Sequence, residues 1–396
     1  MRVPGLPNVH LSYCLNVHPG RTLAEAEVAI FDRAKRVFEE FGRRAAVSGP
    51  FGLGMWFSAE AARELGEPGR LAEFRHRLDA AGFYAFTFNG FPYGRFHGTR
   101  VKEKVYQPDW SDDARYDYTD RLAGLLVSLL PEGVNGSIST LPVTFRPWAT
   151  EEKIALAVQK LADTAALLDE LREDCGREVV LALEPEPGCY LERTDDAVRF
   201  FEDQLLLRGR ERLIEEHGYT KEEAEDALRG HLGVCLDTTH CGVMFEDPAE
   251  VVERLRSHGI RIAKIQFGAA LSVQVGPDGP PQELRAFSDE VYLHQVAIRT
   301  RDGIRFFLDL PEALEQGRAL AGEWRVHFHV PLAWAGEGPI GTTSGQVTSD
   351  FLAAAVRAGV EHFESEIYTL DVFPALRGSA ESVLAQDLAW LWERLS

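Results

Sequence analysis

The sequence lacks the features that would place the protein in a membrane or direct it out of the cell. Nowhere do about 18 or more apolar residues run together without a charge, which a membrane-spanning helix requires. The amino terminus, MRVPGLPNVHLSY, has no basic segment followed by an apolar run, as a signal peptide would have. These absences predict a cytoplasmic protein without a signal peptide or a membrane span.

Cysteine is scarce, and its few positions do not form a framework. The chain has five cysteines, and no two are spaced as a CxxC pair: Cys14, Cys175, Cys189, Cys235 and Cys241. An odd, scattered set is typical of reduced thiols in a cytoplasm, not of a disulfide-stabilised secreted domain.

Basic residues are in the minority, with 42 Lys and Arg against 62 Asp and Glu and a net charge of −20. Such a surface repels phosphate backbones and anionic membranes, so nucleic acid is not an expected partner. The motifs GxxxxGK[ST], GxGxxG, GxSxG and HExxH are all missing, which removes support for nucleotide hydrolysis, Rossmann-type cofactor binding and nucleophile-elbow hydrolysis. A small-molecule metabolite is the expected partner, and the composition leaves a homo-oligomer open.

The 396 residues are 45% apolar, and they alternate between two kinds of segment. Short runs rich in Val, Ile, Phe and Tyr alternate with longer amphipathic stretches, which is typical of repeated β-α units. We therefore predict an α/β fold: one (β/α)₈ barrel domain over residues 1–396. The strand candidates are His10–Leu15, Gly52–Phe57, Tyr84–Phe88, Gly136–Thr140, Val179–Glu184, Gly233–Asp237, Arg261–Phe267, Arg325–Val330 and Glu361–Tyr368. These are nine candidates for eight places, and the sequence does not say which one lies outside the barrel.

Helices are expected between most of the strand candidates, over Leu23–Phe41, Leu71–Ala81, Arg115–Leu130, Glu151–Glu173, Ala249–Ser257, Glu312–Ala321, Thr348–Ala358 and Ala380–Leu395. Two further stretches are additional to the repeated β-α units. Residues 201–230 form charged helical sequence, and residues 271–310 contain a hairpin that turns at Arg301–Gly303, with Asp-Gly as the turn signal. We expect both as insertions into the barrel.

Several strand candidates end in residues that bind metals, and in this barrel type those ends converge on one mouth. In GVCLDTTHCG an apolar strand ends at Asp237, and His240 follows three residues later. This pair can share a metal or a substrate hydroxyl, although Asp and His also cap helices and close turns. In VVLALEPEPG, Glu184 and Glu186 leave an apolar strand, and two carboxylates there are costly to bury without a cation. A salt bridge to a loop arginine is the alternative, more so for Glu186.

Two later strands carry further candidates. RVHFHVP places His327 and His329 on one face, where they can hold a metal or a substrate, or fill a polar part of the barrel. In IAKIQFG, the carbonyl oxygen of Gln266 is a ligand for a hard cation or a core hydrogen-bonding group. Lys264 on the same face stabilises an oxyanion or neutralises surrounding carboxylates.

In the last strand candidate, VEHFESEIYT, the alternate residues His362, Glu364 and Glu366 point to the same face of the sheet. Glu366 is nearest the strand end and is the better ligand candidate, whereas Glu364 lies deeper or faces a helix. Loops after other strands supply candidate substrate contacts, although their Gly and Pro also serve simply to turn the chain. These candidates are His10, Asn16, His18, Asn89, Tyr93, His97 and, in the hairpin insertion, His294, which closes over a ligand or faces solvent.

The order Glu184, Asp237-Thr-Thr-His240, Gln266, His329 and Glu366 on successive strand ends resembles the xylose isomerase-like barrel superfamily. More closely, from Leu11 to about Pro374, the phrases HLSYCLNVHPG, TFNGFPYGRFH, SISTLP, LEPEP, CLDTTH, KIQFGAAL, YLHQ, HFHVP and ESEIYT resemble the EboE-type metabolite traffic proteins, which are tied to export of secondary-metabolite precursors.

The resemblance implies that Glu184, Asp237, Gln266 (or His329) and Glu366 hold one Mn²⁺, Mg²⁺, Co²⁺ or Zn²⁺, with His240 beside it. The extra histidines depart from the usual pairing of two carboxylates in such isomerases and epimerases, and favour a nitrogen-rich, zinc-like or two-metal site.

These residues support three functional hypotheses. The first is a metal-dependent isomerase or epimerase of a small hydroxylated carbonyl compound, in which Glu184 or Glu366 moves the proton. The second is metal-dependent phosphoester hydrolysis of the endonuclease IV type, in which Glu184 bridges two or three metals that His327 and His329 join; the charge counts against DNA as its substrate. The third is a non-catalytic barrel that binds a metabolite and hands it on.

Overall fold

The structure is a computed structural model that describes residues 1–376 and 378–396. Eight parallel strands form one sheet in the order β2-β14-β8-β7-β6-β5-β4-β3, and β1 (Arg2–Val3) pairs antiparallel with β2 at its edge. A parallel bridge between Cys14 and Gly54 joins the ends of β2 and β3 and closes the barrel. The barrel strands are β2 (Leu6–Tyr13), β3 (Phe51–Trp56), β4 (Phe83–Asn89), β5 (Gly136–Thr140), β6 (Val179–Leu183), β7 (Leu232–Asp237), β8 (Arg261–Phe267) and β14 (His362–Ser365). The predicted (β/α)₈ barrel is thus confirmed.

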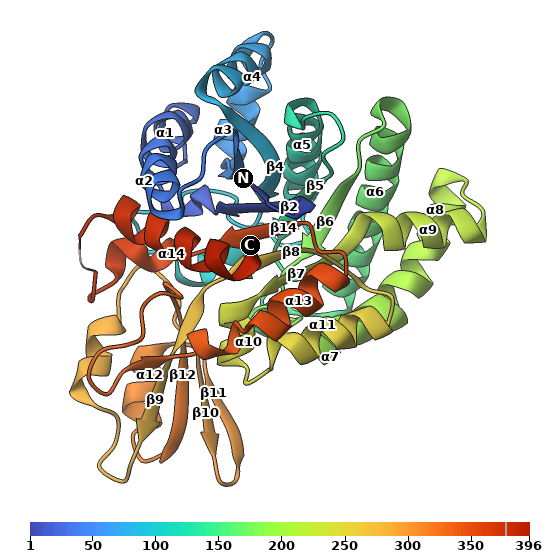
Figure 1. The fold of residues 1–396 in the computed structure, drawn as a ribbon. Helices are drawn as coiled ribbons and strands as arrows, with labels where there is room; N and C mark the ends of the chain where they lie inside the picture. Colours follow the sequence, from blue (N-terminus) through green and yellow to red (C-terminus); the bar gives the residue numbers. More distant parts are fainter. Residues whose placement is uncertain (377) are drawn as a thin grey trace.

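Helices surround the barrel on its outer face (Figure 1). They are α1 (Leu23–Val28), α2 (Lys35–Ala45), α3 (Ala59–Leu65), α4 (Arg70–Ala81), α5 (Asp113–Leu129), α6 (Glu151–Cys175), α7 (Thr194–Phe200), α8 (Arg210–His217), α9 (Lys221–His231), α10 (Thr238–Val243), α11 (Pro248–Ser257), α13 (Ser349–Arg357) and α14 (Ala380–Leu395). π-helical segments, Ala29–Ala34 and Phe201–Gly209, continue α1 and α7. The charged stretch over residues 201–230 is helical, as predicted, except at residues 218–220, which separate α8 from α9. None of the described helices is long and apolar enough to cross a bilayer.

A second sheet of five strands is inserted between β8 and β14 and projects from the barrel (Figure 1). Its order is β11-β10-β12-β9-β13, and all its pairings are antiparallel. The strands are β9 (Ala269–Val275), β10 (Val296–Thr300), β11 (Gly303–Phe307), β12 (Gly322–Val330) and β13 (Gly341–Thr342), with α12 (Leu310–Gln316) between β11 and β12. The predicted hairpin is confirmed, since Thr300 pairs with Gly303 across the turn Arg301-Asp302.

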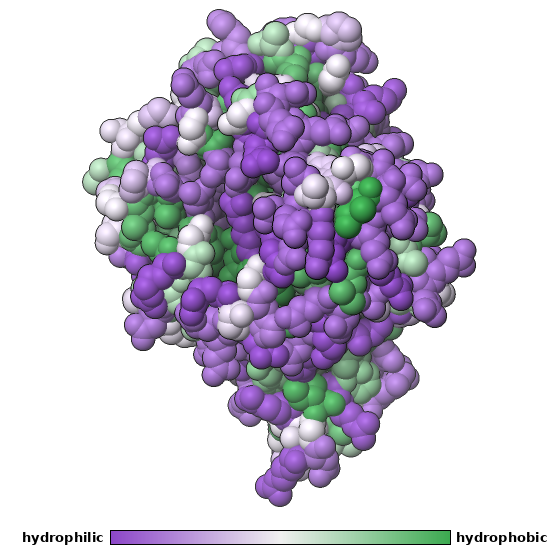
Figure 2. All heavy atoms as spheres, turned by 90° about the vertical axis from the view of Figure 1, so that its right-hand side faces the viewer, coloured by the Kyte–Doolittle hydropathy of each residue, from purple (hydrophilic) through white to green (hydrophobic). Residues whose placement is uncertain are grey.

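The candidate that lies outside the barrel is Arg325–Val330, which belongs to this second sheet. Its sequence does not reveal this, because both sheets bury the strand and both therefore select the same apolar residues. The predicted helix Glu312–Ala321 was too long: α12 ends at Gln316, where Gly317 follows as its C-cap. Figure 2 shows that the outer surface is mostly hydrophilic on the face drawn, with apolar side chains in separate patches.

Asp387 on α14 is hydrogen-bonded both to the barrel and to the segment that follows the inserted sheet's strand β12, near the mouth. Its carboxylate accepts hydrogen bonds from Ser365 Oγ at the end of β14 (2.6 Å) and from the Ala333 amide shortly after β12 (3.1 Å). Burial raises the pKa of Asp387 to about 6, from an ordinary value of 3.8. Between these two values the folded protein holds a proton that the unfolded chain has lost.

We therefore expect Asp387→Asn to change how stability depends on pH. Because the folded-state pKa of this acid is raised, wild-type stability falls through this group as the pH rises from about 4 to about 6. The variant has no carboxyl group at this position and does not lose this stability. The difference in free energy of unfolding, variant minus wild type, should therefore increase across that window by up to about 1.4 kcal/mol per pH unit and stay constant above it. Urea denaturation at several pH values measures the difference. A difference that does not vary between pH 4 and 6 would contradict it.

Candidate active site at the barrel mouth

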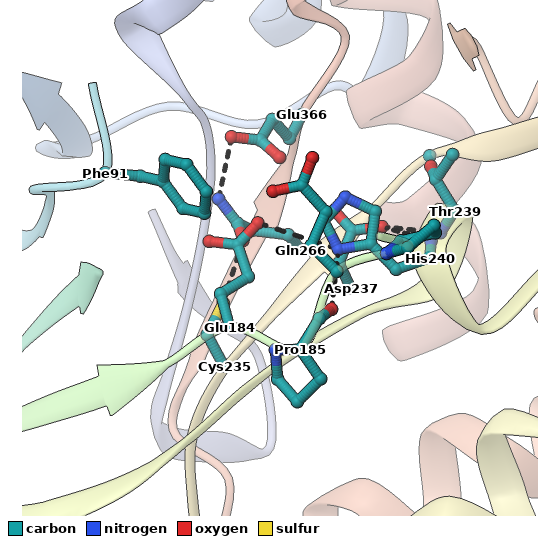
Figure 3. Close-up of polar contacts among 12 residues, drawn as sticks. Phe91, Glu184, Pro185, Cys235, Asp237, Thr239, His240, Gln266 and Glu366 are labelled. Atoms are coloured by element: carbon teal, nitrogen blue, oxygen red, sulfur yellow. Dashed lines mark hydrogen bonds and ion pairs between the residues drawn. The ribbon is translucent and has the colours of Figure 1, made fainter. Parts of the chain in front are cut away.

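Four side chains meet where the sequence places them, at the carboxyl ends of successive barrel strands. Glu184 follows β6, Asp237 ends β7, Gln266 lies on β8 and Glu366 follows β14, and all are buried. His240 on α10 lies beside them, because the turn after β7 folds back over the mouth. Figure 3 shows these residues pointing toward one another. The structure thus gathers the residues that the strand-end argument selected.

His327 and His329 reach the same place from outside the barrel, on β12 of the inserted sheet. The ring of His240 lies 4.7 Å from that of His327 and 5.5 Å from that of His329, measured between centroids. The Nε2 atoms of His327 and His329 are 3.0 Å apart. The inserted sheet therefore supplies two of the three imidazoles at the mouth.

All three imidazoles use Nδ1 to donate a hydrogen bond, which leaves Nε2 without a proton. His240 Nδ1 donates to the main-chain carbonyl of Pro185 (2.9 Å), and His329 Nδ1 donates to that of Glu366 (3.0 Å). A carbonyl oxygen can only accept, so these nitrogens carry the protons. Burial lowers the pKa of His240 to about 3 and that of His329 to about 4, and also lowers the pKa of His327. The rings are thus neutral, and each has an unprotonated Nε2.

Gln295 fixes the tautomer of His327. The Gln295 amide nitrogen donates to the carbonyl of Pro187 (2.8 Å) and to the hydroxyl of Tyr106 (2.9 Å), which orients its oxygen toward His327. His327 Nδ1 lies 2.6 Å from that oxygen and donates to it. Metal-binding histidines are commonly held in this way by a carbonyl or carboxylate behind the ring.

Two carboxylate oxygens at the mouth have no hydrogen-bond partner although they are buried. Asp237 Oδ1 accepts from the amides of Thr239 (2.6 Å) and His240 (3.0 Å), which caps α10, but Oδ2 is unpartnered. Glu184 Oε2 is unpartnered as well. Burial, followed by repulsion from neighbouring carboxylates, raises the pKa of Glu184, and burial raises that of Asp237. Buried, unpartnered oxygens of this kind are costly unless a cation binds them.

Glu366 differs from Glu184 because three amide groups hold one of its oxygens. Asn16 (2.8 Å), Asn89 (2.9 Å) and Gln266 (2.8 Å) all donate to Glu366 Oε1. The oxygen of Gln266 accepts from the thiol of Cys235 (2.8 Å), so it does not face the carboxylates. The amides orient the Glu366 side chain, whose other oxygen, Oε2, lies 3.8 Å from His329 Nδ1.

The donor atoms fall into three overlapping groups that could hold a metal ion. The groups are Glu184–Asp237–His240, Asp237–His329–Glu366 and His240–His327–His329, and within each the ligand atoms lie within 4.8 Å of one another. All members are buried. Carboxylate oxygens and imidazole nitrogens together suit Mn²⁺, Co²⁺ or Zn²⁺, and the oxygens alone suit Mg²⁺.

A pocket opens beside this group, and its empty space, which includes solvent at its opening, is about 480 Å³. Glu184, Glu366 and His240 form its floor, and aromatic and apolar side chains form much of its wall. The wall residues include Phe91, Phe96, Tyr106, Tyr292 and Tyr368. Glu186 also lines the pocket and accepts from Tyr106 Oη (2.7 Å), and burial raises its pKa to about 8.

Lys264 and His10 do not reach the pocket. Lys264 is fully buried in an ion pair with Glu364, and this pair lies inside the barrel. Of the two roles considered for Lys264, this contact fits the neutralisation of a carboxylate. His10 lies nearer the amino ends of the strands, where it pairs with His362 and where its Nδ1 is 2.9 Å from Tyr84 Oη.

The remaining loop candidates lie around the pocket and not on its floor. His18 is buried against Tyr13 Oη (3.0 Å). Tyr93 packs on Tyr118, away from the pocket-lining residues. His97 contacts the carbonyl of Asn16 and the hydroxyl of Tyr292, and so supports residues that do line the pocket. His294 donates to the carbonyl of His327 (2.8 Å) and pairs with Asp289, so it braces β12 and neither covers a ligand nor faces solvent.

Sequence reasoning missed the residues that complete the pocket and orient the histidines. Gln295 follows His294 directly but gives no signal of its own, because glutamine is a common polar residue. Tyr106 and Tyr368 look like core aromatics in the sequence. Lys102 lines the pocket, but its ammonium group is bound to Asp309 (2.7 Å) and to the carbonyl of Asp289 (3.0 Å).

No protein-family model and no curated protein matches the chain. Among solved structures, it is similar to an IolI protein with a binding zinc atom (10% identity, 97% of this chain and 96% of the other, TM-score 0.45). It is also similar to 3-keto-D-glucoside 4-epimerase YcjR from E. coli (12%, 97% and 98%, TM-score 0.44) and to a xylose isomerase domain protein from Alicyclobacillus acidocaldarius (13%, 97% and 98%, TM-score 0.45). Similarity at these identities and TM-scores does not define the chemistry of the site in this chain.

Proposed function

We propose that this chain is a divalent-metal-dependent isomerase or epimerase that acts on a small hydroxylated carbonyl metabolite. One observation carries the proposal: the buried, unpartnered carboxylate oxygens of Glu184 and Asp237 belong to a group of ligand residues, completed by His240, whose ligand atoms lie within 4.8 Å of one another beside the pocket at the mouth. Unpartnered buried carboxylates and lone-pair nitrogens are what a divalent cation requires of its ligands.

Glu184 and Asp237 together with His240, or Asp237 and Glu366 together with His329, would hold the ion. Gln266, the other ligand candidate, supports Glu366 instead, because its nitrogen donates to that carboxylate and its oxygen is taken by Cys235. A divalent ion at this position would bind adjacent oxygens of the substrate and make the hydrogen on the neighbouring carbon more acidic.

Glu184 is the group best placed to move the proton. Its carboxylate lines the pocket and has a free oxygen, whereas one oxygen of Glu366 is held by three amides. Glu184 accepts the proton from the carbon next to the carbonyl, and an enediolate of the substrate remains. Return of that proton to the former carbonyl carbon, with transfer of the hydroxyl proton between the two adjacent oxygens, completes an isomerisation. An epimerisation would instead need a protonated acid that gives a proton to the same carbon from its other face; Glu366, whose pKa is raised by burial, is the candidate for that acid.

The pocket favours an uncharged, polyhydroxylated substrate. Glu184, Glu186 and Glu366 line it, and the ammonium group of Lys102 is already paired with Asp309. Asn16 Oδ1 is buried, has no partner and belongs to a pocket-lining residue, so it can accept a hydrogen bond from a hydroxyl group. The aromatic wall suits the apolar face of a sugar-like molecule. Handling of a metabolite precursor, as the EboE-type resemblance implies, agrees with this chemistry.

Phosphoester hydrolysis has one observation in its favour, because three ligand groups that share Asp237, His240 and His329 resemble a multi-metal arrangement. The acidic lining weighs against an anionic phosphoester. We therefore place isomerisation first.

The test is proton exchange in D₂O. Protein loaded with Mn²⁺, Co²⁺ or Zn²⁺ is incubated with small hydroxyaldehydes and hydroxyketones, and deuterium incorporation next to the carbonyl is followed by NMR. We expect metal-dependent incorporation with at least one substrate, followed by the isomer or epimer. Saturable binding of such compounds without incorporation would contradict the proposal and indicate a metabolite-binding barrel. Release of inorganic phosphate from a phosphorylated analogue, without incorporation, would favour hydrolysis.

Asn89→Leu tests the amide groups that hold Glu366. The change removes one of the three donors to Glu366 Oε1, and loss of such an orienting contact typically lowers metal affinity roughly 10–100-fold. Competition with a chromophoric chelator measures the affinity. Tyr93→Phe, on the loop that follows the same strand but outside the pocket lining, is the matched control and should bind metal like wild type. Equal affinity of the Asn89 variant and wild type would count against this role for the amides.

A further inference from the structure

The wall of the pocket at the mouth differs from its floor in the side chains that it offers to a ligand. The floor is polar, and the wall comes from three separate segments of the chain. The segment after β4 supplies Phe96, Val101 and Val105, the insertion supplies Tyr292 and Leu293, and Tyr368 follows β14. All of these except Leu293 belong, together with Trp56, to one apolar cluster. A ligand on the floor therefore has apolar side chains of three segments beside it.

The hydroxyl groups of the wall tyrosines are engaged by the protein itself. Tyr106 Oη donates to Glu186 (2.7 Å) and accepts from the amide nitrogen of Gln295 (2.9 Å). Tyr292 Oη is hydrogen-bonded to His97 Nδ1 (2.9 Å). These tyrosines thus offer the pocket mainly their rings.

Main-chain groups of the wall are engaged as well. The carbonyl of Pro92 accepts from Trp56 Nε1 (2.9 Å). The amides of Val101 and Lys102 both donate to the carbonyl of Val291 (2.8 and 3.0 Å). A hydroxyl group of a ligand would lose its hydrogen bonds to water against such a wall and gain little in return, because the polar groups there are already paired.

We propose that the substrate is amphipathic: its carbonyl and hydroxyl oxygens lie on the floor, and an apolar substituent of about the size of a phenyl ring lies against the wall. This deepens the proposed function and rests on it for the reacting end of the molecule. The floor does offer unpaired polar atoms, since Asn16 Oδ1 and Glu184 Oε2 are buried without a partner. Burial of a hydroxyl group without a partner costs free energy, whereas burial of apolar surface is favourable. The hydroxyl groups of the substrate are therefore confined to the end that reaches the floor.

The binding of two matched ketones tests the proposal. Erythrulose carries an oxygen on every carbon, and its analogue with a phenyl group in place of the terminal hydroxyl keeps the same hydroxyketone end. Titration calorimetry with protein loaded with Mn²⁺ measures both dissociation constants. We expect the phenyl analogue to bind roughly 10–150-fold more tightly, which corresponds to the 1.5–3 kcal/mol that burial of a large apolar side chain contributes.

Val105→Thr, beside Val291→Thr, locates this preference in the wall. Both valines are partly buried against the same apolar cluster, but Val105 lines the pocket and Val291 is not among the lining residues. Threonine keeps the shape of valine and replaces one methyl group with a hydroxyl. We expect Val105→Thr to lower the preference for the phenyl analogue roughly fourfold, which corresponds to about 0.8 kcal/mol for one buried carbon. Val291→Thr is the matched control and should keep the preference.

Equal or tighter binding of erythrulose by wild type, or no binding of either compound, would overturn the apolar substituent. An equal loss of the preference in both threonine variants would also overturn its place against this wall. Deuterium exchange with the same two compounds separates these results from a failure of the proposed function. Metal-dependent incorporation without a preference for the phenyl analogue would leave isomerisation standing. Tighter binding of the phenyl analogue without incorporation into either compound would support an amphipathic ligand and overturn isomerisation.

Discussion

Replacement of Glu184 with glutamine is expected to lower turnover by about 10²–10⁴-fold, the usual contribution of a positioned general base. Glutamine keeps the size of the side chain but cannot accept the proton. Glu184 makes no hydrogen bond through Oε2, and its Oε1 lies 3.9 Å from Nδ1 of the neutral His240 ring, so the fold loses little. KM should change less than kcat, because the oxygen-binding groups of the pocket remain.

The matched control is Glu178→Gln, just before the opposite end of the same strand. Glu178 pairs with Arg261 and lies far from the pocket-lining residues, so this variant should turn over like wild type. Steady-state kinetics with the substrate found by deuterium exchange measure both variants, and circular dichroism checks the fold. Turnover of Glu184→Gln within tenfold of wild type would remove Glu184 from the proton transfer.

Lys264→Met is expected to cost about 3–5 kcal/mol of stability, which is the usual cost of removing one partner of a buried ion pair. Lys264 and Glu364 are both fully buried, and Glu364 fills the space beside Gly54: a Cβ at that glycine would lie 1.5 Å from Glu364 Oε1. After the change, the Glu364 carboxylate has no cation and no room to turn away, so it must stay buried uncompensated or take up a proton.

The double variant Lys264→Met/Glu364→Leu should recover most of the stability, because an apolar pair of similar volume replaces the ion pair. Urea denaturation of wild type, the single variant and the double variant measures the effect. A single variant as stable as wild type, or a double variant less stable than the single one, would contradict this account of the pair.

Much of the site could be predicted because a parallel barrel brings its strand ends together. Glu184 and Asp237 lie at the ends of clear apolar strands, and Glu366 lies just after the last strand candidate, so the barrel fold alone predicts that they converge. His327 and His329 were also candidates, but their strand belongs to the inserted sheet. Local sequence cannot distinguish two buried strands, because the choice depends on which distant strand each one pairs with.

The supporting contacts could not be predicted for a related reason. Gln295 orients His327, and Asn16 and Asn89 hold Glu366, across separations of 32, 350 and 277 residues. Nothing in the local sequence marks such pairs. Asn16 and Asn89 were expected as substrate contacts, and their place beside Glu366 became clear only once the strand ends were assembled.

The account rests on a metal bound at the mouth, and metal content measures this most directly. Protein purified without chelator or added metal is analysed for Mn, Co and Zn, together with a variant that carries Asp237→Ala and His240→Ala. Each of the three ligand groups contains at least one of these two residues. We predict at least one ion per chain in wild type and loss of most of it in a variant that still folds. Absence of metal from both proteins, with no uptake on dialysis against Mn²⁺ or Zn²⁺, would contradict the account and leave a metabolite-binding barrel.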